Sequence, residues 1–352
     1  MMKNMTRLML GATIAVVCVL AIGQAHAVSG NEVTELIETL EVGDPVYYKN
    51  LTIVPIYTTR IKDQSRYTTL DEALDNGLLE IKELEGGRVP QVELTNRSDE
   101  YIFLMGGEVL TGCKQDRLVG RDVLIKPKSR RVIVPVYCVE ASRWTYESDS
   151  FYSKRNLATG ILRAKSQKAG KSAQSDIWDE IKSMSGEAGV SSPTSRLQAV
   201  YESEGTRREL SGFEDRMEDI PHLYPDVIGA VVGVGDEITS VDVFANPVLF
   251  QRLWPKLLKS AALSAISHKR TGSITQGDAV RLLRMLHDRR YKQKAGIDLG
   301  FELSVIDDEV NVNALVYRNA VVHLAGFPEG ETACGSKTDG DHERRIPVIR
   351  RP

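Results

Sequence analysis

Short runs of β-type residues, separated by turn residues, recur at close intervals in the first half of the chain. The clearest runs cover residues 51–58, 79–84, 89–95, 101–105, 119–125 and 131–139. Gly86-Gly87 and Lys126-Pro127 lie between neighbouring runs, as turn residues do. Several short strands at this spacing are typical of a sandwich or an open antiparallel sheet. We therefore predict a β-rich, sandwich-like unit over residues 46–145, with Pro55 placing the first run at an edge or a bulge.

The chain changes character after this unit. Residues 146–226 carry polar stretches and two segments of helical spacing, which predicts a helical connector, with irregular structure over the charged residues 202–225. Residues 227–327 open with two strand-like runs joined at Gly235-Asp236, a hairpin signal, and close with three alternating runs. This second unit should therefore contain a hairpin, helices and a three-strand meander. The fold class predicted for the whole chain is α+β.

Capping residues mark the helices of the second unit. Asn246-Pro247 can begin one helix, in which Pro255 predicts a kink or a restart, and Thr275 with Asp278 can cap another. At the ends of the chain, residues 28–45 read as a short helix and linker. Residues 328–352 are polar without an apolar period, which predicts a disordered tail.

The first 27 residues have the layout of a secretory signal peptide. Lys3 and Arg7 precede an apolar run over residues 8–22, and Ala25-His26-Ala27 is a small-residue cleavage pattern. The apolar run is shorter than the roughly 20 residues that a spanning helix needs. We expect cleavage, export to the periplasm or the extracellular space, and no membrane span in the cleaved protein.

Composition and motifs limit the partners that the chain can be expected to bind. The formal charge of −3 gives no general attraction to nucleic acid or anionic lipid. The six histidines do not pair with one another, with cysteines or with carboxylates at the spacing of a zinc site. The glycine-rich residues 229–235 lie in a hairpin pattern and lack the Lys-Ser/Thr of a phosphate loop. We expect no nucleic-acid partner, no metal and no cofactor.

Residues 106–144 differ from the rest of the chain. Their apolar residues favour burial of the segments in which they lie, but charged residues interrupt these segments. Glu108 follows Gly106-Gly107 and precedes Val109-Leu110. A buried carboxylate needs a cationic partner or a cavity, since an unpaired buried charge costs several kcal/mol. The candidate partners and neighbouring polar or aromatic residues are Lys114, Gln115, Arg117, Arg143 and Trp144. They are compatible with two arrangements: a buried ion-pair network, or a pocket for a small anionic or polyol ligand with Trp144 as a flat wall.

Two further side chains are candidates for catalysis. Cys138 could act as a nucleophile with Glu140 and a histidine, although no histidine lies near it in sequence. His323, between Val322 and Leu324, fits a hydrogen-bonded core histidine better than an acid/base. Three cysteines remain after cleavage, so at least one has no intramolecular disulfide partner, and pairing of Cys113 with Cys138 depends on geometry.

Three motifs occur in order along the chain: GGEVLTGCKQDR at residues 106–117, CVEASRW at 138–144 and VVHLAGF at 321–327. Over about residues 46–327 the sequence resembles the ARG and Rhodanese-Phosphatase-superfamily-associated Protein domain, a bacterial family without a settled activity. The family's gene-neighbourhood association implies ADP-ribose or nucleotide-related chemistry. The positions that match its motifs are Glu108, Lys114, Gln115, Arg117, Cys138, Glu140, Arg143, Trp144 and His323. Cys113 and Asp116 depart from the family pattern, and Cys113 thereby favours a local disulfide.

Three functional hypotheses follow. The first is an exported domain that binds a small polar or anionic ligand in a cleft built by Glu108, Lys114, Gln115, Arg117 and Arg143. The second is a hydrolase of a glycosidic or phosphoester bond, with Glu108 or Glu140 as general acid/base, which requires a carboxylate exposed in a cleft. The third is an envelope interaction protein, which requires an exposed apolar patch.

Overall fold

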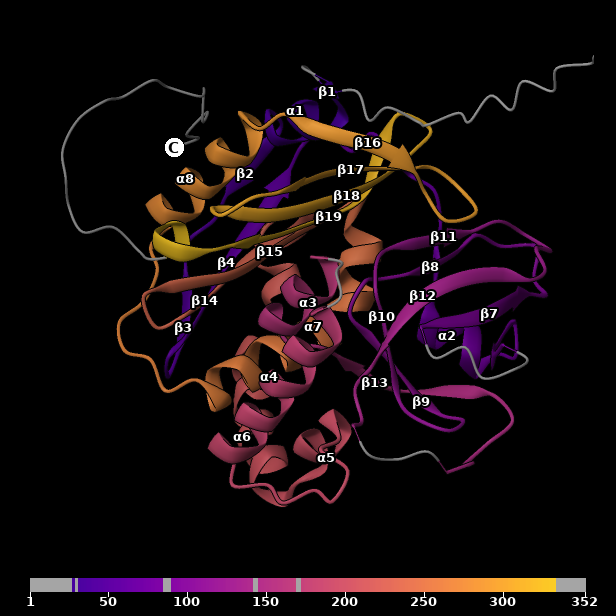
Figure 1. Cartoon of the computed structure of the whole chain (residues 1–352). Coiled ribbons are helices and arrows are strands. Elements are labelled where there is room, and N and C mark those ends of the chain that lie inside the picture. The colour runs from indigo at the N-terminus through magenta and orange to yellow at the C-terminus, as the bar shows by residue number, and fades with distance from the viewer. Residues whose placement is uncertain (1–26, 29–30, 85–89, 142–144, 169–171, 334–352) are drawn as a thin grey trace, which may run out of the picture.

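The computed structural model describes residues 27–28, 31–84, 90–141, 145–168 and 172–333. Over this part of the chain, sheets and helices form an α+β fold, as the sequence predicts (Figure 1). Each described helix is too short or too polar to cross a membrane. The expected signal peptide and tail lie almost wholly outside the described residues.

The largest sheet combines strands from both ends of the chain, and ten of its strands lie in the described residues. In spatial order they are β1 (Ala27–Val28), β16 (Tyr291–Ala295), β17 (Phe301–Ile306), β18 (Val310–Tyr317), β19 (Ala320–Pro328), β15 (Glu237–Phe244), β14 (Val227–Val234), β4 (Leu51–Thr58) and β2 (Leu40–Val42), with β3 (Val46–Tyr48) also paired to β4. The β14–β15 hairpin and the β17–β19 meander confirm two sequence predictions.

The strand β4 corrects two expectations. It pairs with β14 on one side and with β2 and β3 on the other, so Pro55 lies in an interior strand and not at an edge. The alternative of a bulge agrees with a register shift in the β4–β14 pairing, which falls close to Pro55, between Val227 and Gly229 of β14. For the same reason residues 46–58 belong to the large sheet and not to the β-rich unit that follows them. Seven of the eight β4 residues are buried, which fits a strand covered on both faces.

A separate sandwich-like unit follows β4. Among the described residues one of its sheets has the order β13 (Phe151–Leu157), β9 (Glu108–Gly112), β10 (Arg117–Val119), β12 (Val132–Cys138), β7 (Gln91–Asn96) and β6 (Leu79–Glu83). Its other sheet has the order β11 (Val123–Ile125), β8 (Ile102–Leu104) and β5 (Thr68–Thr69). The two sheets share a hydrophobic core with α2 (Leu70–Asp75). A capping box between Thr69 and Glu72 begins α2.

Helices cover both faces of the large sheet (Figure 1). On one face lie α1 (Glu32–Ile37) and α8 (Gln276–His287), and on the other lie α3 (Gly160–Gln167), α4 (Ala173–Glu187), α5 (Leu197–Glu202), α6 (Glu204–Met217) and α7 (Pro247–Ser267). Short 3-10 turns form η1 (Ile220–His222) and η2 (Gly330–Ala333). The predicted caps are confirmed at Asn246 for α7 and at Thr275 with Asp278 for α8.

Two helices differ from expectation. The helix α7 runs through Pro255 without a restart, while the alternative of a kink at Pro255 stays a prediction; the helix packs on the sheet, α6 and the sandwich-like unit. The helix α6 occupies part of the segment expected to be irregular. Its buried residues Thr206, Leu210, Phe213 and Met217 have helical spacing. The other faces of α6 are highly charged, and these charges made the helical spacing of its buried residues difficult to recognise in the sequence.

Candidate functional site

Glu108 begins β9 and is fully buried. Its Oε1 accepts a hydrogen bond from Lys256 Nζ of α7 at 2.6 Å, and its Oε2 accepts one from the backbone N–H of Met105 at 2.9 Å. Lys256 Nζ also lies 2.6 Å from Asp71 Oδ2 of α2. The cationic partner of Glu108 is therefore Lys256, and the expected role of Lys114 or Arg117 as its partner is wrong.

Burial and charge act on this triad in opposite directions. Burial raises the pKa of Glu108 to about 7, although the attraction of Lys256 opposes the change. Burial alone would lower the pKa of Lys256, but the carboxylates of Glu108 and Asp71 outweigh it and hold that pKa above its usual value. Lys256 is thus a charged residue on an otherwise apolar part of α7, and it links α7 to both β9 and α2.

The turn at residues 106–107 connects Glu108 to a second buried cluster. The N–H of Gly106 donates to Asp122 Oδ1 at 2.8 Å, and its carbonyl accepts from Arg163 Nε of α3 at 3.1 Å. Gly107 has φ +104°, and a Cβ there would lie 2.6 Å from Arg163 Cγ. Only glycine allows the arginine to cross the turn so closely.

Arg163, Asp242, His323 and Asp122 form this second cluster between the sandwich-like unit and the large sheet. Arg163 donates two hydrogen bonds to the Asp242 carboxylate, at 3.0 and 2.5 Å. The Nδ1 of His323 lies 2.7 Å from Asp122 Oδ2, and its Nε2 lies 3.1 Å from Asp242 Oδ1. The imidazole also stacks on Phe244, with 4.3 Å between ring centroids. Since each ring nitrogen faces a carboxylate, the arrangement favours imidazolium.

The same contacts explain the proton affinities of the cluster. Burial alone would lower the pKa of His323, but Asp122 and Asp242 outweigh it and raise the pKa to about 9. Burial alone would raise the pKa of Asp242, and Arg163 and His323 hold it well below its usual value instead. His323 is a structural histidine with both nitrogens bonded, as its apolar neighbours in sequence favoured.

We expect the His323 imidazole to titrate with a midpoint near pH 9 in the folded protein, compared with about 6.5 in an unfolded chain. Because the folded pKa is the higher one, its stabilising contribution is full below about pH 6.5 and is lost as the pH rises through 9. NMR of 15N-histidine-labelled protein, with His323→Gln to assign the signal, measures this midpoint. A midpoint at or below 6.5 would contradict the ion-pair assignment.

A third cluster surrounds Arg117, which is buried in β10. Its Nη1 donates to Gln115 Oε1 at 2.9 Å and to Cys138 Sγ at 2.7 Å, and its Nη2 lies 3.6 Å from Glu83 Oε1. Burial raises the pKa of the Cys138 thiol, although Arg117 partly opposes the change. The sulfur contacts Arg117 and Gln115, and neither is a general base. The geometry therefore gives no support to a nucleophilic Cys138.

Neither Cys113 nor Cys138 is in a disulfide, and both are buried. Cys113 lies in the turn after β9 with φ +48°. The local disulfide that we expected at Cys113, where the sequence departs from the family pattern, is therefore not formed.

Glu140 is also held by neighbouring groups. Its Oε1 accepts from Thr194 Oγ1 at 2.9 Å, and Arg196 Nε lies 3.9 Å from its Oε2. Arg196 makes its closer contact with Asp116, through Nε at 2.6 Å and Nη2 at 3.1 Å. Lys114 lies nearer the surface, with its Nζ 3.9 Å from Glu83 Oε2. The expected ligand-binding residues Arg143 and Trp144 lie outside the described residues.

Six of the predicted site residues thus lie in buried polar clusters, namely Glu108, Gln115, Arg117, Cys138, Glu140 and His323. Two of these clusters meet at the 106–108 turn. A groove of about 350 Å³ adjoins the first cluster between α2 and α7. We call it the α2–α7 groove; its lining residues are Thr69, Asp71, Glu72, Asp75, Arg155, Glu214, Arg252, Pro255, Lys256 and Lys259. Lys256 and Asp71 belong both to the groove and to the Glu108 cluster.

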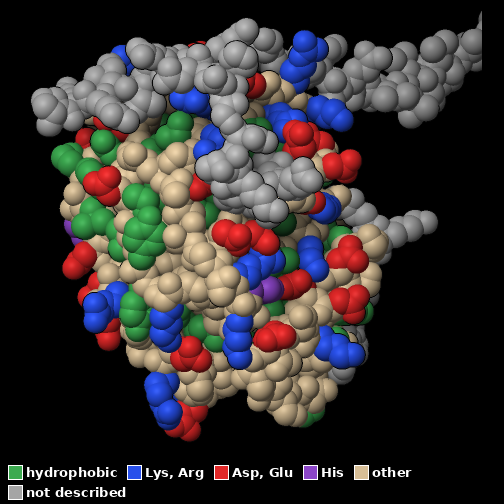
Figure 2. Space-filling model, turned by 90° about the vertical axis from the view of Figure 1, so that its left-hand side faces the viewer, with side chains coloured by type: hydrophobic (Ala, Val, Ile, Leu, Met, Phe, Trp, Pro, Cys, Tyr) green, Lys and Arg blue, Asp and Glu red, His purple; other side chains and the backbone are tan. Residues whose placement is uncertain are grey.

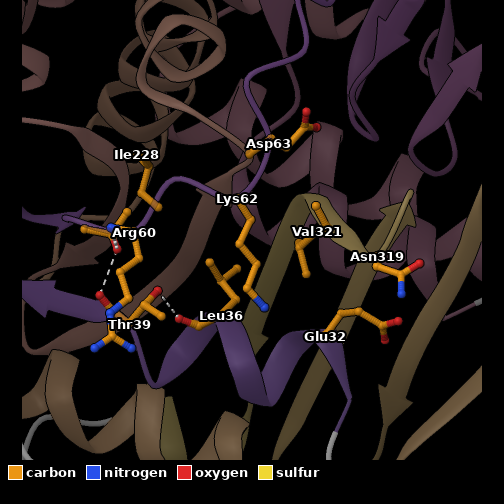
Figure 3. Close-up of a pocket in the computed structure, with 12 residues that line it drawn as sticks. Glu32, Leu36, Thr39, Arg60, Lys62, Asp63, Ile228, Asn319 and Val321 are labelled. Carbon is orange, nitrogen blue, oxygen red and sulfur yellow. Dashed lines mark hydrogen bonds between the residues drawn. The ribbon is translucent and has the colours of Figure 1, made fainter.

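Another hollow lies between α1 and the loop that follows β4 (Figure 3). Glu32, Arg60, Lys62 and Asp63 stand around it, and Thr39 closes one side. Its volume of about 20 Å³ holds about one water molecule. The hollow is too small for an organic ligand, so the α2–α7 groove is the better candidate site.

A family model for the ARG and Rhodanese-Phosphatase-superfamily-associated Protein domain, ARPP-1, matches residues 39–327. The chain belongs to this family. The match covers most of the chain and includes the large sheet except β1 and the last residue of β19, the sandwich-like unit and all three buried clusters. No curated protein and no solved structure matches the chain.

In this ARPP-1 domain, sequence reasoning missed the residues that complete the clusters. They are Asp71, Asp122, Arg163, Asp242 and Lys256. Lys256 interrupts the apolar face of α7, and Asp242 interrupts the apolar strand β15. A charged residue within an apolar segment is the same signal that drew attention to Glu108. A search of the whole chain for this signal would have found both Lys256 and Asp242.

Proposed function

We propose that this ARPP-1 domain is exported and binds a small polar ligand in the α2–α7 groove. The observation that carries the proposal is the pairing of charges along the groove. Arg252, Lys256 and Lys259 are spaced four and three residues apart and so share one side of α7. Carboxylates from α2 and α6 face them, and donors alternate with acceptors along the lining.

Each groove cation has its own carboxylate. The pairs are Arg252–Glu72 at 3.3 Å, Lys256–Asp71 at 2.6 Å, Lys259–Glu214 at 3.9 Å and Arg155–Asp75 at 2.6 Å. Equal numbers of opposite charges give the groove no net attraction for an anion. A hydroxyl group can donate to a carboxylate and accept from a neighbouring cation at the same time. The lining therefore favours a neutral polyol such as a sugar, and the volume falls within the usual range for ligand sites.

The hydrolase hypothesis receives less support than binding. Glu108 and Glu140 are only 0% and 1% exposed, and both accept hydrogen bonds from neighbouring groups. A general acid must reach the bond that it protonates, and neither carboxylate borders the groove. Asp71 does line the groove, but Lys256 holds it at 2.6 Å. These contacts favour binding over hydrolysis as the role of the groove.

Two observations on the described surface favour a small ligand over a nucleic-acid or an envelope partner. Figure 2 shows Lys and Arg side chains interspersed with Asp and Glu on the face that it draws, where a nucleic-acid site would gather basic residues. Exposed large apolar side chains on the described surface belong to different strands, for example Tyr47 to β3, Ile133 to β12 and Ile306 to β17. Single apolar residues of this kind are normal on a soluble protein.

The proposal is tested by thermal shift with monosaccharides, disaccharides, nucleosides and ADP-ribose, because a ligand that binds only the folded protein raises its Tm. We expect a neutral sugar to raise the Tm, and ADP-ribose to do so less than a neutral sugar. Lys259→Gln and Glu72→Gln should each weaken binding at least about tenfold, the equivalent of one hydrogen bond to a charged group.

Lys49→Gln is the matched control, since Lys49 forms an exposed pair with Glu209 and does not line the groove. It should leave the ligand-induced shift unchanged. A shift that survives both groove substitutions would place the ligand elsewhere, and a panel without any shift would count against the proposal.

A further inference from the structure

Arg252 is one of the residues that line the α2–α7 groove. The same residue lines a second hollow of about 470 Å³ at the beginning of α7, which we call the second chamber. Its lining residues are Ile61, Gln64, Ser65, Arg66, Tyr67, Asp226, Asn246, Pro247, Val248, Leu249 and Arg252. Arg252 therefore stands at the junction of two spaces, and each of them is large enough for part of an organic ligand.

The side chain of Arg252 is held at this junction. Its Nη1 donates to the carbonyl of Tyr67 at 3.2 Å and to Glu72 Oε2 at 3.3 Å. Tyr67 lines the second chamber, and Glu72 lines the α2–α7 groove. A ligand in the groove would thus have its end next to the second chamber, with the guanidinium between them.

The second chamber differs from the groove in chemistry. Four of its residues are aliphatic or proline, namely Ile61, Pro247, Val248 and Leu249. Val248 lies in the first turn of α7 and is 53% exposed. Covering this apolar surface with a ligand group would remove it from water, which is favourable in proportion to the area covered.

The chamber is also preformed. The Nδ2 of Asn246 donates to the carbonyls of Asp63 and Ser65 at 3.3 and 3.2 Å, while its Oδ1 caps α7 by accepting from the N–H of Leu249. Tyr67 Oη donates to Asp63 within the same loop. The loop is thus fastened to the beginning of α7, so a ligand need not order it on binding.

We propose that the second chamber takes an apolar or aromatic substituent attached to the polyol, so that the natural ligand is a glycoside with an aryl or alkyl group. This inference rests on the proposed function, because the polyol portion is assigned to the α2–α7 groove. The paired charges select the sugar, and the chamber selects its substituent.

The test compares methyl and phenyl β-glycosides of glucose, galactose, mannose and N-acetylglucosamine by isothermal titration calorimetry. For at least one sugar the phenyl glycoside should bind about tenfold more tightly than the methyl glycoside, since the phenyl ring buries additional apolar area. Val248→Asp should reduce the phenyl affinity to the methyl level and leave the methyl affinity unchanged. Lys259→Gln should weaken both.

Val248→Asp is compatible with folding, because Val248 is exposed and a carboxylate is favourable in the first turn of a helix. An unchanged Tm without ligand checks this. Ile306→Asp is the matched control, since Ile306 is 49% exposed and lies at the end of β17; it should keep the phenyl advantage.

The outcomes separate the two proposals. Equal methyl and phenyl affinities, or a phenyl advantage that survives Val248→Asp, would overturn the second chamber as a subsite and leave the groove proposal standing. Failure of both series to bind would count against the proposed function itself.

Discussion

Replacing Lys256 by methionine should lower the free energy of unfolding by about 3–5 kcal/mol at pH 8, above the pKa of about 7 of Glu108, which is the usual cost of breaking a buried ion pair from one side. Methionine keeps the length and the helix propensity of lysine but leaves Glu108 without its cation. Glu108 is fully buried, so water cannot replace the lost contact at 2.6 Å. Urea unfolding followed by circular dichroism measures the difference.

Two variants control this measurement. Lys49→Met removes an exposed cation whose pair with Glu209 is solvated, and should cost less than about 1 kcal/mol. The double variant Lys256→Met/Glu108→Leu removes both members of the Lys256–Glu108 pair and leaves Asp71, whose side chain is partly exposed. It should recover much of the loss, because an apolar pair can replace a buried ion pair. A loss below 1 kcal/mol for Lys256→Met alone would show that Glu108 is not held as a buried anion.

The second large effect is expected at Asp242. Asp242→Asn keeps the shape of the side chain but removes the charge that faces both Arg163 and His323, and should cost about 3–5 kcal/mol at pH 7. The cost should fall above about pH 9, where His323 is neutral and only Arg163 lacks its partner. Urea unfolding at pH 7 and pH 10 tests both parts.

Asp307→Asn is the matched control for Asp242→Asn. Asp307 pairs with Arg289 at 3.0 Å, and both side chains are partly solvated. Its loss should stay below about 1 kcal/mol and should not depend on pH between 7 and 10. Equal losses for the two variants would mean that the Asp242 cluster contributes no more than a surface pair.

Much of the fold could be predicted because its signals are local. The β14–β15 hairpin follows from Gly235-Asp236 between two strand-like runs, and α7 follows from Asn246-Pro247 at its first turn. The α8 capping box lies within four consecutive residues. Such features depend on neighbours in the chain, and the sequence shows them directly.

The pairing of β4 and the partner of Glu108 depend on residues far away in the chain. An apolar run such as β4 fits an edge or an interior strand equally well until its partner β14 is known. The sequence flagged Glu108 as a charge that needs a partner, but nearby cations such as Lys114 were the natural candidates. Lys256 reaches Glu108 only because α7 packs against the sandwich-like unit.

The pairing of β4 with β14 also has a consequence for synthesis of the chain. The ribosome produces β4 at residues 51–58, but β14 follows only at residues 227–234. The sandwich-like unit lies between them and draws its core from residues of its own segment, so it can fold first. Throughout this interval the apolar strand β4 has one edge without a partner, because β2 and β3 pair only with its other edge. A chaperone that binds extended apolar segments would therefore find its target there until the hairpin emerges.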